Sequence, residues 1–179
     1  MRCSALILFA LLVALPPIAK SAGGISLSFT TPFSEGVLSE QTQDYAKAEA
    51  AYDRAVPLAK TDHDRYYSLS GRARTRSALG RHAEARADLD AAAQTAEAKK
   101  HLWEFTLDRV NITRDQGDLV AASAAYRDLV KLDDQSRERK ITLLLAEAHL
   151  KRAWGDLSGS VGLLDQAEIL LKEFNNFSA

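Results

Sequence analysis

The side chains that most often carry chemistry are few and scattered in this 179-residue chain. Its histidines never stand three or four residues apart, as two zinc ligands on one helix would. They are His63, His82, His101 and His149. The single cysteine is Cys3, and no serine lies in the Gly-x-Ser-x-Gly turn of a nucleophile. Metal-dependent and covalent catalysis therefore have no candidate residues, and we expect no metal ion and no cofactor.

Carboxylates are numerous, but their spacing is typical of solvated helix surfaces. Asp88 and Asp90 form one close pair, and Asp133 and Asp134 form another. Acid–base catalysis needs two carboxylates that share a cleft and differ in pKa, and nothing in these spacings indicates a cleft. No glycine-rich phosphate loop is present either, because GSVG at 159–162 falls inside a predicted helix. We therefore predict a protein that is not an enzyme, and an enzyme with an unrecognised site stays as the weaker alternative.

Composition and charge predict a folded, helical protein. The chain is 46% apolar, has only four prolines, and is rich in Ala, Leu, Glu and Arg after residue 40. The net charge of −1 provides no overall basic field. Nucleic acid and anionic membrane surfaces are therefore not expected as partners.

The first 38 residues differ in character from the rest. Arg2 precedes an unbroken apolar run at 5–15, two prolines end that run, and Ala19-Lys20-Ser21 provides small residues for cleavage. This order predicts a signal peptide at 1–21 and a protein exported to the periplasm or secreted. The run has 11 residues, too few for a membrane span of roughly 20, so no span is expected after cleavage. Residues 22–38 mix Gly, Ser, Thr and Pro without a clear period and are predicted to be a flexible linker.

Helical patterning then extends over 39–175 and repeats itself. Gly80, Gly117 and Gly155 are 37 and 38 residues apart, and each is followed by a polar residue. Glycine closes helices because it adopts the left-handed conformation without steric cost, and Asp118 and Asp156 can cap the next helices. A near-constant period of this length indicates a repeat array of helical hairpins.

The helix after each turn carries the same four positions on one face, spaced three, four and three residues apart. The four sets are Tyr45, Ala48, Tyr52 and Ala55; His82, Ala85, Leu89 and Ala92; Leu119, Ala122, Tyr126 and Leu129; and Leu157, Ser160, Leu164 and Ala167. The small second residue permits close approach of a neighbouring helix, and the larger third residue fills the adjacent groove. These positions are predicted to form the core.

With Gly-Asp-Leu at 117–119 and 155–157 and YAKAEAAYDRA at 45–55, the chain resembles the tetratricopeptide repeat family. The resemblance covers nearly all of residues 40–174 and implies an all-α fold, a short right-handed solenoid of antiparallel hairpins. The first helices depart from the family at its apolar seventh and aromatic eleventh positions. Those positions hold Arg72, Arg109 and Glu147, and Arg76, Thr113 and Lys151.

In proteins of this family the first helices line a concave surface that receives a peptide or a helix. The resemblance therefore implies a binding groove at matching positions of the first helices. These are Arg74, Ser77, Asn111, Arg114, His149 and Arg152. Because guanidinium groups suit carboxylates, the expected partner is another protein that offers an acidic segment or a free C-terminus. The last helix, predicted at 158–174, is unusually apolar, which leaves self-association into a homo-oligomer as an alternative.

Overall fold

The computed structural model describes residues 27–176, and these residues are all-helical without a strand. The helices are α1 (Leu27–Gln41), α2 (Tyr45–Ala55), α3 (Asp62–Ala78), α4 (His82–Ala93), α5 (Ala96–Lys100), α6 (Leu102–Asp115), α7 (Leu119–Lys131), α8 (Arg137–Ala153) and α9 (Leu157–Asn176), with a short 3₁₀ turn at Val56–Leu58. No helix in this part of the chain has the length and apolar character needed to cross a membrane. The signal peptide predicted at 1–21 lies outside the described residues.

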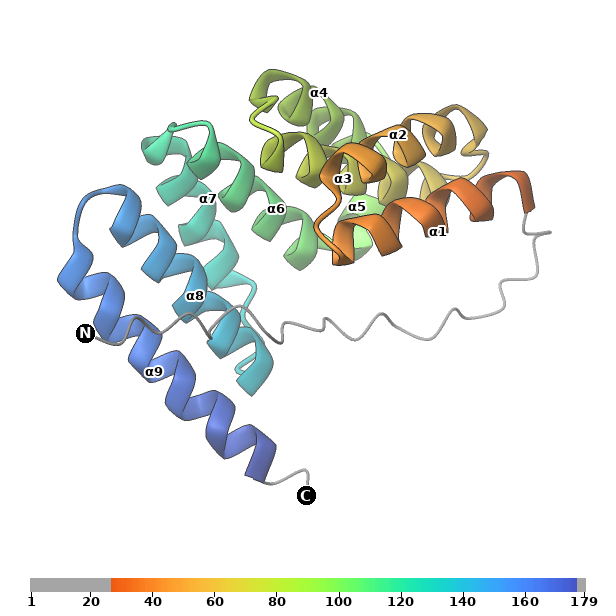
Figure 1. Cartoon of the computed structure of the whole chain (residues 1–179). Coiled ribbons are helices and arrows are strands. Elements are labelled where there is room, and N and C mark those ends of the chain that lie inside the picture. Colours follow the sequence, from red (N-terminus) through yellow and green to blue (C-terminus); the bar gives the residue numbers. More distant parts are fainter. Residues whose placement is uncertain (1–26, 177–179) are drawn as a thin grey trace.

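Four hairpins follow one another along the chain (Figure 1). They pair α1 with α2, α3 with α4, α6 with α7, and α8 with α9, and α5 connects the second pair to the third. The first helices α1, α3, α6 and α8 contact each other in that order. Each of the second helices α2, α4 and α7 also packs against the first helix of the next hairpin. Every hairpin is therefore held mainly by its chain neighbours.

The predicted glycine turns are confirmed at all three positions. Gly80, Gly117 and Gly155 have φ values of 76°, 86° and 88°, in the left-handed region that glycine tolerates. After the second and third of these turns, Asp118 accepts a hydrogen bond from the Ala121 amide (3.0 Å) and Asp156 accepts one from the Gly159 amide (2.8 Å). The sequence thus specifies both the end of one helix and the start of the next.

The prediction of a flexible linker at 22–38 is wrong for residues 27–38, which belong to α1. The sequence pattern did not predict this helix, because Pro32 and Gly36 are residue types that are disfavoured inside helices. The turn after α1 is also unusual, because Gln43 takes the positive φ (59°) that glycine takes in the later turns. Asp44 then caps α2 by accepting a hydrogen bond from the Lys47 amide. The helical region therefore begins before residue 39, and α1 is the helix that pairs with α2.

The four-position pattern correctly predicts the core at its second and fourth positions. Its first position is only partly buried in Tyr45, His82 and Leu119 and is exposed in Leu157, so the prediction is wrong there. The small residues Ala48, Ala85 and Ala122 are completely buried, and Ser160 is buried in α9. In the third position Tyr52 and Leu89 are buried, whereas Tyr126 and Leu164 are partly exposed. Packing is thus tightest in the first two hairpins and loosest in the last, which has no described helix after it.

Candidate functional site

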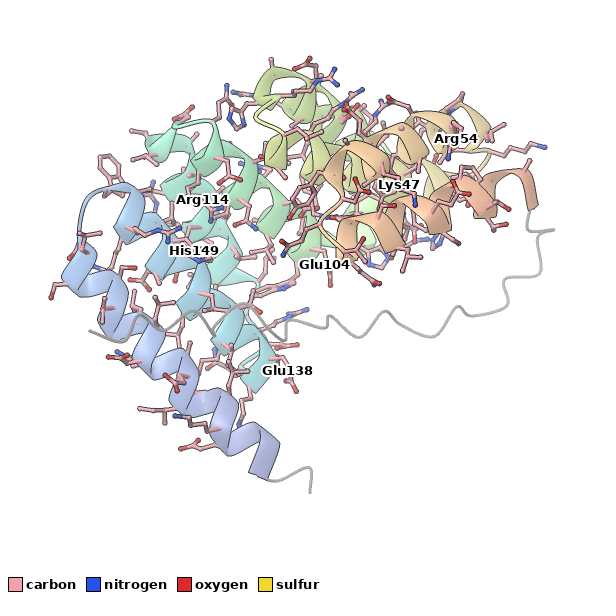
Figure 2. The ribbon with its side chains drawn as sticks, in the orientation of Figure 1. Lys47, Arg54, Glu104, Arg114, Glu138 and His149 are labelled. Carbon is pink, nitrogen blue, oxygen red and sulfur yellow. The ribbon has the colours of Figure 1, made fainter. Side chains whose placement is uncertain are left out.

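The predicted groove residues lie on three neighbouring helices. Arg74 and Ser77 are on α3, Asn111 and Arg114 on α6, and His149 and Arg152 on α8. We call the surface formed by α1, α3, α6 and α8 the first-helix face. Figure 2 shows Arg114 and His149 close together where α6 and α8 meet. The six residues do not form one continuous basic site, since their interactions separate them into two groups.

Arg74 is already neutralised by carboxylates of the neighbouring hairpins. Its guanidinium donates to Glu40 of α1 (2.7 Å) and to Asp108 of α6 (3.1 Å). The hydroxyl of Tyr52 also donates to Glu40, at 2.8 Å. This group links three hairpins. Arg74 therefore offers no unpaired positive charge to a partner, because two carboxylates that are distant in sequence meet it in the fold.

Asp108 is the buried member of this group, with 11% of its side chain exposed. Burial raises the pKa of its carboxyl to about 6, and Glu40 and Glu104 act in the same direction, while Arg74 opposes the shift. A carboxyl whose pKa is higher in the folded state binds a proton more tightly there than in the unfolded chain. Its contribution to stability is therefore greatest below the unfolded pKa and is lost as pH rises through 6.

The variant Asp108→Asn tests the direction of this pKa shift. Relative to that variant, the natural chain should gain about 2–3 kcal/mol of unfolding free energy as pH falls from 7 to 4. The comparison is made by urea unfolding of both proteins at each pH, so that the contributions of other carboxyls cancel. A difference between the two proteins that is the same at both pH values would contradict the shifted pKa.

The second group joins α6 to α8. Arg114 donates to Asn111 (3.0 Å) and to Asp115 (2.7 Å), and it lies 3.4 Å from Nδ1 of His149. The pKa of His149 is lowered by its burial, then by the positive charges of Arg114 and Arg152, with Asp115 opposing. Arg152 is exposed at the edge of this group. His149 is thus partly buried beside two positively charged side chains, between α6 and α8.

Ser77 joins α3 to α6 and adds no charge. It is buried, and its hydroxyl donates to Asp115 of α6 at 3.2 Å. Asp115 is therefore shared by Ser77 of one hairpin and Arg114 of the next. Ser77 serves here as a contact between hairpins.

A second ionic cluster, which sequence reasoning missed, lies between α2, α3 and α4. Asp88 accepts from Arg72 (2.6 and 2.9 Å) and from Arg76 (2.7 Å), and only 6% of its side chain is exposed. Arg72 also contacts Asp53, and Arg76 contacts both Asp53 and Glu49. The two arginines are four residues apart and hence on one helix face. Their spacing was the available signal, but the acidic partners come from two other helices.

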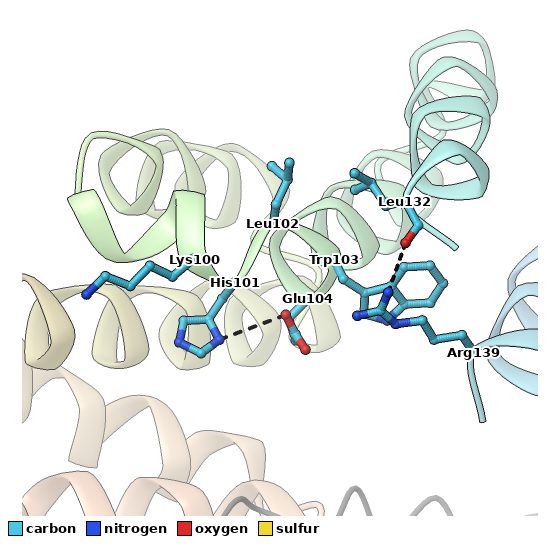
Figure 3. Close-up of a pocket in the computed structure, with 7 residues that line it drawn as sticks. All are labelled: Lys100, His101, Leu102, Trp103, Glu104, Leu132 and Arg139. Atoms are coloured by element: carbon cyan, nitrogen blue, oxygen red, sulfur yellow. Dashed lines mark hydrogen bonds and ion pairs between the residues drawn. The ribbon is translucent and has the colours of Figure 1, made fainter. Parts of the chain in front are cut away.

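A small pocket of about 250 Å³ opens near the start of α6 (Figure 3). The guanidinium of Arg139 lies 4.5 Å from the ring centroid of Trp103 and donates to the Leu132 carbonyl at 2.9 Å. The other lining residues are Lys100, His101, Leu102 and Glu104. Arg139 is therefore engaged on both sides, as a cation over an aromatic ring and as a hydrogen-bond donor.

Two histidines far apart in sequence approach one carboxylate beside this pocket. His63 of α3 and His101, which follows α5, lie 3.3 and 3.4 Å from the same oxygen of Glu97. The pKa of Glu97 is lowered, first by its hydrogen bond from Lys100 and further by His63. Among the described residues, no group of three or more His, Cys, Asp or Glu side chains is arranged to hold a metal ion. The contacts tie α3 to α5.

The sequence matches no model of a known protein family, and no curated protein is significantly similar to it.

Proposed function

We propose that the chain is a short right-handed solenoid related to tetratricopeptide repeats and acts as a non-catalytic scaffold that binds another protein. The observation that carries the proposal is the order of contacts among the helices. The first helices touch one another from α1 to α8, while each second helix leans on the first helix of the next hairpin. Stacking of this kind presents one continuous surface whose shape is fixed by the core.

The contact order also favours curvature toward the first-helix face. Helices that touch at every step lie on the inner side of a curved row, whereas α2, α4 and α7 are not joined to one another by contacts of similar extent. A concave surface of helices can receive an extended peptide or a helix without folding around it. The positive field around His149 supports an acidic segment or a C-terminal carboxylate as the bound group. We place the binding region at Asn111, Arg114, His149 and Arg152.

A defined acidic peptide provides the test. Fluorescently labelled hexaglutamate, titrated with the purified protein, should bind and should lose about tenfold in affinity with Arg114→Ala/Arg152→Ala, since each tenfold step is about 1.4 kcal/mol. The matched control is Arg86→Ala/Arg127→Ala, which removes the same charge from exposed positions on α4 and α7. Equal affinity of the two double variants would refute an α6–α8 binding region.

A second measurement separates this site from general charge attraction. Bound carboxylates would offset the field of Arg114 and Arg152, so the pKa of His149 should rise when the peptide binds. Titration of the His149 ring resonances by NMR, with and without peptide, measures the change. An unaltered His149 titration at saturating peptide would place the peptide elsewhere.

We further propose that the protein works after export, in the periplasm or the secreted space, on the evidence of the leader-like sequence at 1–21. The N-terminal sequence of the protein isolated from its own cells tests this proposal. Retention of Met1 in a cytosolic fraction would rule it out.

A further inference from the structure

Corresponding positions join the first hairpin to the second and the third hairpin to the fourth. Glu49 of α2 accepts from Arg76 of α3 at 2.9 Å, and Ser123 of α7 accepts from Trp154 at the end of α8 at 3.4 Å. Both acceptors stand four residues after the first residue of their helix. The residue at this position in α9 is Val161. An apolar side chain thus occupies in α9 the place that carries a polar contact between hairpins in α2 and α7, while α4 has the exposed Arg86 there.

The outer side of α9 is incompletely covered. Val161 is 56% exposed, and Leu164 is partly exposed although its counterpart Tyr52 is completely buried. Within residues 27–176 no helix follows α9, and Figure 1 shows it at one end of the row of hairpins. The positions that α2, α4 and α7 use to pack on a following first helix are therefore unused in α9.

The opposite end of the row presents the complementary surface. The turns at Gln43 and Gly80 are 37 residues apart, so Ser34 and Leu38 of α1 correspond to Gly71 and Thr75 of α3. Gly71 lies against Tyr52 of the preceding hairpin and Thr75 is completely buried, whereas Leu38 is 62% exposed. A groove of about 400 Å³ follows α1 here. It is lined by Thr30, Thr31, Ser34, Glu35 and Leu38.

We propose that α9 of one molecule packs in the groove along α1 of a second molecule, so that the row of hairpins continues from copy to copy. The proposal rests on the hairpin stacking proposed above, because it extends the same contact of a second helix with the next first helix. Val161 and Leu164 would meet Leu38 and exclude water from all three side chains. The contact joins two different surfaces and leaves each molecule with one of them open, which produces open chains of copies and no closed dimer.

Two single substitutions test the pairing of different surfaces. Leu38→Glu damages the α1 groove and leaves α9 intact, while Val161→Glu does the reverse. By sedimentation velocity, the natural protein purified from the cells that produce it should grow beyond a dimer as its concentration rises. Each variant alone should remain monomeric. An equimolar mixture of the two should form dimers and nothing larger, because one intact groove and one intact α9 remain.

A control variant and the salt dependence of assembly distinguish this contact from other kinds of association. Val130→Glu charges another exposed apolar residue, on α7, and should leave assembly unchanged. Higher salt should not weaken assembly, since the contact is apolar. The proposal fails if the natural protein stays monomeric at all concentrations, as it would with its own N-terminal segment in the groove. It also fails if Leu38→Glu still dimerises, which would indicate a symmetric α9 contact.

The test is independent of peptide binding. Arg114→Ala/Arg152→Ala should assemble like the natural protein, and the monomeric Leu38→Glu and Val161→Glu variants should still bind hexaglutamate. A natural protein that binds hexaglutamate but stays monomeric would therefore refute this inference alone. The reverse result would refute the α6–α8 binding region and leave the copy-to-copy contact standing.

Discussion

Replacing Tyr52 with alanine is expected to lower the free energy of unfolding by about 3–5 kcal/mol, the usual cost of deleting a buried aromatic ring. The ring is completely buried between α1, α2 and α3. Gly36 and Gly71 lie against the Tyr52 ring, and a Cβ atom on either glycine would come within 3.0 Å of the ring. Because neither glycine carries a side chain, nothing attached to these two positions can fill the space that the ring leaves. Urea unfolding followed by circular dichroism measures the loss.

Two matched variants separate packing from hydrogen bonding at this residue. Tyr52→Phe keeps the ring but removes the hydroxyl that donates to Glu40, and should cost about 1 kcal/mol. Tyr126→Ala removes the corresponding ring of α7, which is partly exposed, and should cost less than Tyr52→Ala. A loss below about 1 kcal/mol for Tyr52→Ala would contradict the tight contact of the first two hairpins.

Replacing Asp88 with alanine is expected to cost about 3–5 kcal/mol, because removal of one partner from a buried ionic cluster leaves the other charges uncompensated. Asp88 accepts from two nitrogens of Arg72 and from one nitrogen of Arg76. Asp53 and Glu49 remain, so the loss should fall toward the lower end of this range. The midpoint of urea unfolding, with an unchanged slope, is the measurement.

Asp90→Ala is the control for this prediction, since Asp90 is exposed on the same helix and its loss should change stability by less than about 0.5 kcal/mol. A second variant tests the cause. Arg72→Leu/Arg76→Leu/Asp88→Leu removes the three charges at the centre of the cluster, while Asp53 is half-exposed and Glu49 keeps its contact with Arg81. This variant should recover much of the stability lost by Asp88→Ala, because apolar residues often replace a buried ionic group without cost. Equal loss in the two proteins would mean that the arginine charges are not the source of the destabilisation.

Much of the local structure was predictable because it depends on residues close together in the chain. Glycine turns, aspartate caps and the four-position pattern each involve interactions over a few residues, and the structure confirms them from residue 45 onward, apart from the first position of the pattern. The prediction failed at α1 for an equally local reason. Gln43 adopts the left-handed conformation that usually identifies glycine, and Pro32 interrupts the helical pattern.

The candidate site was less predictable, because charge compensation depends on contacts between hairpins. Sequence alone placed Arg74 and Arg114 in one predicted basic groove on the first helices. In the fold, Arg74 meets Glu40 and Asp108, each 34 residues away. Arg114 instead contacts its own neighbour Asp115 and approaches His149. Arg114 thus meets one carboxylate and has the exposed Arg152 nearby, whereas Arg74 meets two carboxylates.

The sequence by itself determined that this protein is built from helices, where most of those helices end, and which residues form the buried stripe of each second helix. These features follow from backbone conformation, capping and periodicity, which act over less than one helical turn or within one helix. Only the tertiary structure decided which charges are paired, which carboxyl is buried, and which apolar surfaces are left exposed at α1 and α9. Those properties depend on side chains from different hairpins meeting at 3–4 Å, and a contact at that range is specified by packing across the whole row.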